Sequence, residues 1–233
     1  MLTKRSSEKE NMDNFELSGN DLDKTLIGLT SINKTLGNTA STLKAVKKEL
    51  LKITKSVKIV DLGCGGGDNL RAIENWCHKN NRPIELFGID ANPHIIEYAR
   101  QQNNSSLNIN YLKADILVDD FKLPTCDILI SSHFMYHFSD DQMVEFLKKS
   151  KPNVSSTIIF SELQRNCFAY LLFKIGSFFL PFSKIVKEDG LLAIRRAFTK
   201  KELINILERA EFSNYNISWK WAFRFLVVIS VKD

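Results

Sequence analysis

The 233-residue chain lacks the features that would mark it for secretion or for a membrane span. Its four cysteines are widely spaced and form no CxxC pair, which favours four reduced thiols, three of them buried, in a cytoplasmic protein. The polar, charged start MLTKRSSEKENMDN has no signal-peptide pattern. The most apolar run, residues 167–182, contains Lys174 and Gly176 and is shorter than the about 20 apolar residues that a spanning helix needs. We therefore expect no transmembrane segment.

Strong charge of one sign is also missing. The formal net charge is +5, and basic and acidic residues are mixed along most of the chain, so we expect no nucleic-acid partner. We expect a monomer or a homodimer. The apolar run at 167–182 predicts a partly buried helix that roofs a pocket, and contact with a membrane surface is the weaker interpretation.

The N-terminal quarter differs in pattern from the rest. Residues 1–14 are polar and predict a disordered tail. Leucines and isoleucines spaced three and four apart then predict two helices, separated at Gly37 and the asparagine after it. We expect a helical cap at 15–55 and a main domain at 56–233, with a helical insertion at about 163–198.

From residue 57 onward, strand patterns alternate with helical patterns. Strand–helix repeats of this kind predict a parallel sheet with helices on both faces. The final strand follows a short turn instead of a helix, so we expect it to run antiparallel. The predicted strands are 57–62, 84–90, 109–113, 126–131, 154–160, 215–218 and 223–231.

The stretch VKIVDLGCGGGDNL, residues 57–70, joins the first strand to the first helix of this domain. The strand ends at Asp61 and runs into four glycines broken only by Cys64. Ligands of open α/β sheets bind at such turns, where glycine lets them approach the backbone. A phosphate-binding P-loop is excluded because the chain has no Gly-Lys pair. The GxGxxG pattern of dinucleotide sites is not matched either. Its third glycine position is occupied by Asp68 when the pattern starts at Gly63, and by Leu70 when it starts at Gly65.

Acidic residues end the first three strands of the domain: Asp61, Asp90 and Asp115. S-adenosylmethionine carries a sulfonium and an ammonium, so it tolerates an acid beside the turn. Asp61 can position its amino acid head, Asp90 can accept both ribose hydroxyls, and Asp115 can accept the adenine amine. The set favours S-adenosylmethionine as cofactor. An NAD enzyme would also place an acid at Asp90, so that residue alone does not discriminate, and all three acids could merely terminate strands or cap helices.

With VDLGCGGG at 60–67, GID at 88–90, ADI at 114–116 and DILISS at 127–132, the sequence resembles the class I S-adenosylmethionine-dependent methyltransferases. The resemblance implies a Rossmann-like three-layer sandwich with a seven-stranded, mostly parallel sheet and an antiparallel last strand. It assigns the methionine part of the cofactor to Asp61 and the glycine turn, ribose to Asp90, and adenine to the third strand. The cofactor-binding residues predicted in this way are Asp61, Gly63, Cys64, Gly65, Asp90, Ala91, Asp115, Ile116 and Ser131.

The segment SSHFMYHFSDDQ, residues 131–142, is similar to a segment of bacterial small-molecule methyltransferases, including quinone- and polyketide-modifying ones, in which a histidine precedes a helix. His137 matches that histidine, whereas His133 departs from the pattern. We expect His137, together with His133, to face the acceptor as a base or hydrogen-bond partner. A purely structural role for His137 is an equal alternative. The two histidines stand four residues apart, but no third ligand is near, so we expect no metal.

The sequence therefore predicts methyl transfer to the oxygen or carbon of a small, aromatic or apolar acceptor. The amino-methylating enzymes of DNA and of some RNA carry an Asn/Asp-Pro-Pro-aromatic run after the fourth strand, where this chain has SSHF. Two alternatives stay open. One is a nicotinamide-dependent oxidoreductase, and the other is a non-catalytic, methyltransferase-like binding protein.

Overall fold

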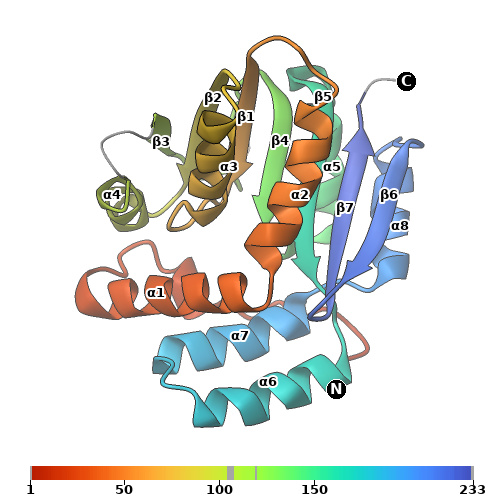
Figure 1. Cartoon of the computed structure of the whole chain (residues 1–233). Coiled ribbons are helices and arrows are strands. Elements are labelled where there is room, and N and C mark those ends of the chain that lie inside the picture. The colour runs from red at the N-terminus through yellow and green to blue at the C-terminus, as the bar shows by residue number, and fades with distance from the viewer. Residues whose placement is uncertain (1, 104–107, 119, 232–233) are drawn as a thin grey trace.

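Seven strands form one sheet in the order β3-β2-β1-β4-β5-β7-β6 in the computed structural model, which describes residues 2–103, 108–118 and 120–231 (Figure 1). All neighbouring strands are parallel except β7, which runs antiparallel to both β5 and β6. This topology confirms the predicted fold class. The strands are β1 (Val57–Leu62), β2 (Ile84–Asp90), β3 (Ile109–Lys113), β4 (Cys126–Ser132), β5 (Val154–Leu163), β6 (Tyr215–Lys220) and β7 (Arg224–Ser230).

Helices cover both faces of the sheet, and the alternation of side chains along the buried strands supplies both cores. In β1, Ile59 packs into the core formed with the first helical layer, whereas Val60 and Leu62 pack into the core on the opposite face. The first layer contains α2 (Asn38–Leu50), α3 (Asp68–Lys79) and α4 (Pro93–Gln101), and the second contains α5 (Asp140–Ser150) and α8 (Lys200–Arg209).

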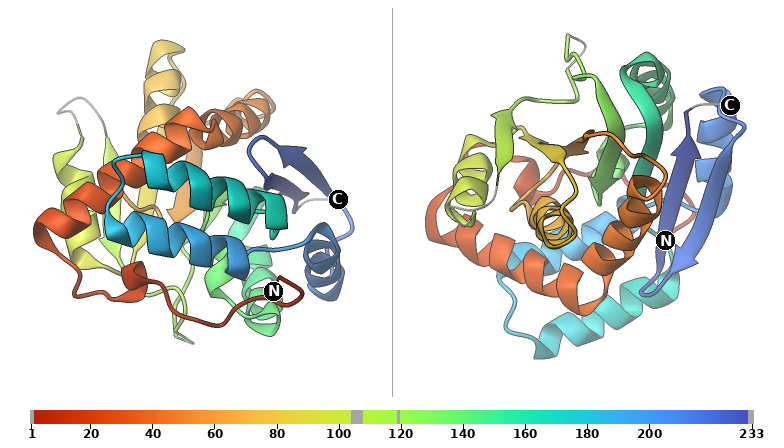
Figure 2. Two further views of the ribbon diagram at one scale, coloured as in Figure 1. Left: turned by 90° about the horizontal axis from the view of Figure 1, so that it is seen from below. Right: turned by 45° about the horizontal axis from the view of Figure 1, so that its top comes forward.

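Three further helices lie across the carboxyl ends of the parallel strands and form a cap (Figures 1 and 2). They are α1 (Gly19–Thr35), α6 (Cys167–Phe179) and α7 (Lys184–Arg196). The break between α1 and α2 falls at Gly37, whose φ of +77° is in the left-handed region that glycine adopts without strain. Among the helices of the described residues, none is long and apolar enough to cross a membrane.

The N-terminal segment, residues 2–17, is ordered, which contradicts the predicted disordered tail at 1–14. Residue 1 lies outside the described residues. The segment runs along α7 and past the short turn η2 (Met135–His137), and it contains a turn of its own, η1 (Asn11–Asp13) (Figure 2).

Specific polar contacts hold this segment in place. The Arg5 guanidinium donates to the carbonyl oxygens of Tyr136 and Phe138, each at 2.8 Å. The Asp189 carboxylate on α7 accepts the backbone N–H of Asn11 at 2.8 Å. The expectation of disorder was wrong because it rested on the polar composition of the tail. The partners that order the segment lie more than a hundred residues away along the chain, and local composition does not reveal them.

Candidate functional site

A cavity of about 1040 Å³ lies between the cap and the carboxyl ends of the strands. This is the edge of an open α/β sheet at which ligands bind. The glycine turn after β1 lines one part of it, and α6 and α7 line another. The cavity also brings together most of the predicted site residues, namely Gly63, Cys64, Gly65, Asp90, Ala91, Asp115, Ile116, His133 and His137.

The glycine turn offers bare backbone to this cavity. Gly63, Gly65 and Gly67 have φ values of +62°, +51° and +81°, which L side chains rarely adopt. A Cβ on Gly63 would collide with the Phe134 ring, so this glycine is also required for packing. A Cβ on Gly65 would meet no atom within 4 Å. Gly65 is therefore the point where a ligand can come closest to the turn.

Asp90 ties the turn to the end of β2. Its Oδ2 accepts the backbone N–H of Gly65 at 3.1 Å, and its Oδ1 accepts the N–H of Asn92 at 3.1 Å. Burial raises the pKa of Asp90, and these hydrogen bonds oppose that rise. Asp115 lines the cavity from the end of β3 and accepts the N–H of Leu117 at 2.9 Å. The two carboxylates thus lie on the β2–β3 side of the cavity.

Two predicted cofactor residues do not line the cavity. Asp61 is 1% exposed, and neither of its carboxylate oxygens has a hydrogen-bond partner. Burial, followed by the nearby charges of Asp90 and Asp68, raises the pKa of Asp61 well above its usual value. Ser131 is also buried, and its Oγ donates to the carbonyl of Leu62 at 3.0 Å. Its neighbour Ser132 lines the cavity in its place.

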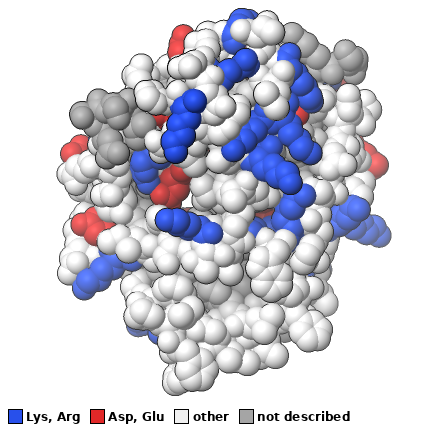
Figure 3. All heavy atoms as spheres, in the orientation of Figure 1, with Lys and Arg blue, Asp and Glu red and all other residues white. Residues whose placement is uncertain are grey.

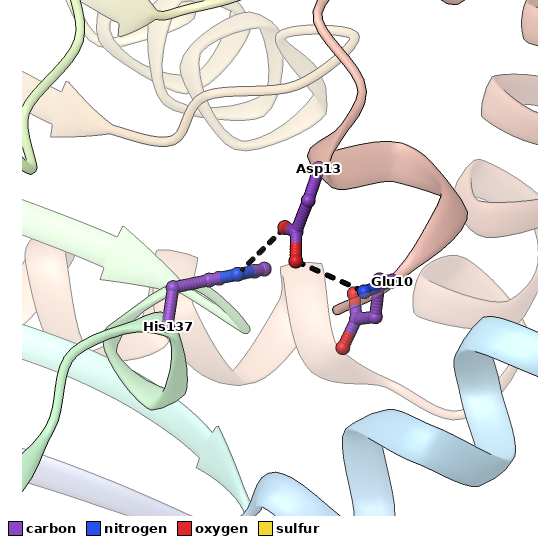
Figure 4. Close-up of side chains that lie close together, drawn as sticks. All are labelled: Glu10, Asp13 and His137. Carbon is purple, nitrogen blue, oxygen red and sulfur yellow. Dashed lines mark hydrogen bonds and ion pairs between the residues drawn. The ribbon is translucent and has the colours of Figure 1, made fainter. Parts of the chain in front are cut away.

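His137 is held by a residue of the N-terminal segment. Its Nδ1 lies 3.0 Å from Oδ1 of Asp13 (Figure 4). Its ring also stacks on Tyr136 with 4.6 Å between centroids. Burial lowers the pKa of His137, and the hydrogen bond to Asp13 partly opposes this. Burial acts to raise the pKa of Asp13, but His137 and Arg196 together hold it well below its usual range.

Glu10, Asp13 and His137 form a cluster whose potential ligand atoms lie within 4.8 Å of one another (Figure 4). Arg196 already supplies a cation there, because its Nη1 lies 2.9 Å from Asp13 Oδ2 and 3.7 Å from Glu10 Oε1. Asp13 and Arg196 therefore form an ion pair, and His137 lies against the same carboxylate. Burial raises the pKa of Glu10 to about 8. His133 takes no part in this cluster. Glu10 and Asp13 were not predicted from the sequence as site residues, because the N-terminal segment was expected to be disordered.

His133 occupies a different part of the cavity wall. Its φ is +54°, and its backbone N–H donates to the carbonyl of Ser161 at 2.9 Å. Its Nε2 is buried without a partner. Burial, and then the charge of Arg224, lower the pKa of His133 to about 3. The imidazole is therefore neutral near pH 7. Arg224 was not predicted from the sequence, where it is one of many basic residues without a motif.

Comparison with known sequences agrees with this geometry. Residues 59–154 match a family described as a methyltransferase domain. A curated relative from Campylobacter jejuni subsp. jejuni, named carboxy-S-adenosyl-L-methionine synthase, is 26% identical over 193 residues, which cover 78% of this chain and 79% of the relative. A protein of the same name from Campylobacter jejuni subsp. doylei is also 26% identical, over 190 residues.

Solved structures share the fold at low sequence identity. A plantazolicin methyltransferase in complex with S-adenosylhomocysteine has a TM-score of 0.62 at 17% identity and covers 90% of this chain and 95% of its own. A magnesium protoporphyrin IX methyltransferase from Synechocystis, also with bound S-adenosylhomocysteine, has a TM-score of 0.57 at 13% identity. The match covers 92% of this chain and 88% of that structure's chain.

Proposed function

The chain is a class I S-adenosylmethionine-dependent methyltransferase, and on that premise we propose that it methylates an oxygen or carbon of a small, aromatic or apolar acceptor. S-adenosylmethionine is its cofactor. One observation carries the proposal. A single cavity joins the open glycine turn and the acids of the β2–β3 side to an apolar wall that includes Phe134, Phe173 and Phe182. The acceptor is a small molecule, since the site is a cavity and not a long basic groove.

The residues present suit this cofactor. The partly exposed carboxylates of Asp90 and Asp115 can accept hydrogen bonds from ribose hydroxyls and from the adenine amine. Ala91 and Ile116 lie beside them and offer apolar contact to the base. The two oxygens of Asp61 have no partner, and its pKa is raised by burial. A cationic sulfonium or ammonium held near the turn would favour the ionised form of this buried carboxyl group. Gly65 leaves room for the amino acid part.

His137 is the proposed base for an oxygen acceptor. Methyl transfer from a sulfonium is an in-line displacement, so the protein mainly orients the acceptor and excludes water. Asp13 accepts the Nδ1–H of His137, which leaves Nε2 as the atom that takes the proton. His133 is too weak a base for this step, because its pKa is lowered to about 3, and its proposed role is that of a hydrogen-bond partner.

Calorimetric titration with S-adenosylmethionine, S-adenosylhomocysteine and NADH tests the cofactor site. We expect micromolar binding of the first two and none of NADH. Asp90→Ala should weaken that binding at least tenfold, whereas Asp23→Ala, an exposed acid on α1, should leave it unchanged. A screen of phenols and quinols for S-adenosylhomocysteine release then identifies the acceptor class. Preference for NADH, or equal binding by both variants, would contradict the proposal.

A second candidate comes from the name of the Campylobacter relatives, which describes the synthesis of a carboxylated S-adenosylmethionine. The observation that favours it is the buried cation Arg224 in the cavity wall, which could balance a carboxylate. Incubation with S-adenosylmethionine and a small-molecule extract, followed by mass spectrometry, separates the two. A carboxylated sulfonium would select the second candidate, and S-adenosylhomocysteine with a methylated product would select the first.

The outer side of α6 is an exposed apolar face, formed by Phe168, Leu171, Leu172, Ile175, Phe178 and Phe179. Phe178 is 78% exposed and Phe179 is 76% exposed. In Figure 3 the lower part of the molecule, where α6 lies in Figure 1, is almost free of charged side chains, whereas lysines and arginines gather above it. Contiguous exposed apolar patches on a protein surface often mark an interaction site.

We propose that this α6 face rests on a membrane surface. The only charged residue of α6 is Lys174, and its exposed face is built from large aromatic and aliphatic side chains, as in helices that lie at a membrane surface. An apolar acceptor could then enter the cavity from the bilayer. All four cysteines are free, and the cytoplasm is the proposed location.

Flotation with phosphatidylcholine vesicles, with and without phosphatidylglycerol, tests this surface. We expect the wild-type chain to float with the anionic vesicles, and a variant carrying Phe178→Ser and Phe179→Ser to stay unbound. A chain that does not float, and instead forms a dimer that the same substitutions dissociate, would show that a second copy covers α6.

A further inference from the structure

Arg224, the first residue of β7, is a buried cation in the cavity wall. Its side chain is among the largest that are fully buried, and the residue is 2% exposed. Its Nη2 donates to the carbonyl oxygens of Leu36, at 2.5 Å, and Trp221. Its Nε has no hydrogen-bond partner. Both of its protein partners are therefore neutral carbonyls.

This arrangement leaves a buried positive charge without a counter-ion. Burying an unpaired charge is costly, and the usual remedy is a carboxylate or phosphate partner. Among the described residues, none places a carboxylate within ion-pair distance of Arg224. Burial alone lowers the pKa of Arg224 to about 10, so the group stays charged at neutral pH.

His133 adds a second unpartnered group to the same wall. Both residues line the cavity, and the charge of Arg224 is one of the two causes that lower the pKa of His133. The buried Nε2 of His133 has no partner. A neutral imidazole can donate a hydrogen bond from Nε2 when its other nitrogen is unprotonated. The wall thus offers one cation and one further donor.

The position of Arg224 in the sheet separates it from the cofactor acids. Asp90 ends β2 and Asp115 follows β3, and both strands lie on one side of β1. The strand that Arg224 begins, β7, lies on the opposite side, beyond β4 and β5. A cofactor held by the glycine turn and the two acids leaves the β4–β7 side to the acceptor.

We infer that Arg224 and His133 form a subsite that binds a carboxylate of the methyl acceptor. The inference rests on the proposed methyl transfer and narrows its substrate class from apolar molecules in general to apolar or aromatic acids. A guanidinium suits this role because its planar donors match a carboxylate. The apolar part of the acceptor would lie against the phenylalanines of the cavity, and the subsite would fix which atom faces the methyl group.

A panel of hydroxybenzoic and hydroxycinnamic acids, each paired with its methyl ester, tests this subsite. Binding is measured by calorimetry on protein saturated with S-adenosylhomocysteine. The variants are Arg224→Met, which removes the charge but keeps an unbranched, flexible side chain, Arg224→Lys, which keeps the charge, and His133→Asn. Arg209→Met, on the exposed part of α8, is the matched control. Thermal unfolding reports whether each variant is folded.

We expect acids to bind the wild-type chain at least tenfold more tightly than their esters. Arg224→Met should remove that preference and Arg224→Lys should retain part of it, while S-adenosylhomocysteine affinity stays unchanged in both. If Arg224→Met weakens S-adenosylhomocysteine binding instead, Arg224 serves the cofactor and the inference fails. Equal binding of acids and esters, or no binding of any acid, also overturns it. Loss of cofactor binding by the wild-type chain would instead refute the proposed function.

Discussion

Nδ1 of His137 lies 3.0 Å from Oδ1 of Asp13, which joins a turn after β4 to the N-terminal segment. The pair selects one tautomer of the imidazole and leaves Nε2 with a free lone pair. Asp13 is itself fixed by Arg196 at 2.9 Å and by the backbone N–H of Glu10 at 2.9 Å. The base proposed for catalysis is therefore oriented by residues of the N-terminal segment and, through them, by α7.

Asp13→Asn should lower kcat for an oxygen acceptor by ten- to a hundredfold, because the amide no longer holds the imidazole in one tautomer. The rate should rise with pH until His137 is neutral, and this limb should move to lower pH in the variant, since Asp13 acts to raise the pKa of His137. Stopped assays from pH 5 to 9 measure both effects. Asp141→Asn, exposed at the start of α5, is the control. Unchanged kcat in Asp13→Asn would leave His137 with a structural role only.

Gly65→Ala should cost about 1 kcal/mol of stability, because an L residue is strained at a φ of +51°. It should also weaken S-adenosylhomocysteine binding, since the added methyl group occupies the open side of the turn. Gly176→Ala within α6 is the comparison, because Gly176 has no positive φ and no atom within 4 Å of an added Cβ, so the change should be neutral or stabilising. Urea unfolding and calorimetry provide the two readouts. Tight cofactor binding by Gly65→Ala would argue against a close approach at this glycine.

Arg5→Ala should release the N-terminal segment. The substitution removes hydrogen bonds to the carbonyls of Tyr136 and Phe138, and we expect a loss of about 1–3 kcal/mol. Hydrogen exchange at the backbone amide of Asn11 should become faster, as its bond to Asp189 depends on the position of the segment. Lys4→Ala, an exposed neighbour, should change neither quantity. Equal protection in both variants would show that Arg5 does not anchor the segment.

Glu162 predicts a pH dependence of stability. Its Oε1 accepts the backbone N–H groups of Phe134 and Met135, and burial raises its pKa to about 7 from the usual 4.5. A raised carboxyl pKa means that the folded state binds more protons between these values. The stabilisation is thus complete below pH 4.5 and is lost as the pH rises towards 7, by at most about 1.4 kcal/mol per pH unit.

Glu162→Gln should abolish that slope, so the stability difference between wild type and variant should shrink or change sign from pH 4.5 to 7. Urea unfolding at half-unit pH intervals measures it, with the exposed Glu208→Gln as control. Parallel curves for wild type and Glu162→Gln would mean that Glu162 titrates as an ordinary carboxyl group.

The sequence by itself determined the sheet, the glycine turn and the acids that end the strands, because each is encoded by neighbouring residues. Alternation along β1 and the glycines from Gly63 to Gly67 are local patterns whose backbone preferences do not depend on distant contacts. The cofactor class followed from the same short stretch.

Only the tertiary structure decided which residues line the proposed acceptor side of the cavity. Asp13 meets His137, and Arg224 reaches the cavity, because segments far apart in sequence pack together, and no local pattern records those contacts. Ser131 shows the same limit on a smaller scale, since a change of one residue along β4 reverses the face and puts Ser132 on the cavity wall. Local periodicity specifies elements, whereas the partners of a buried charge depend on the whole fold.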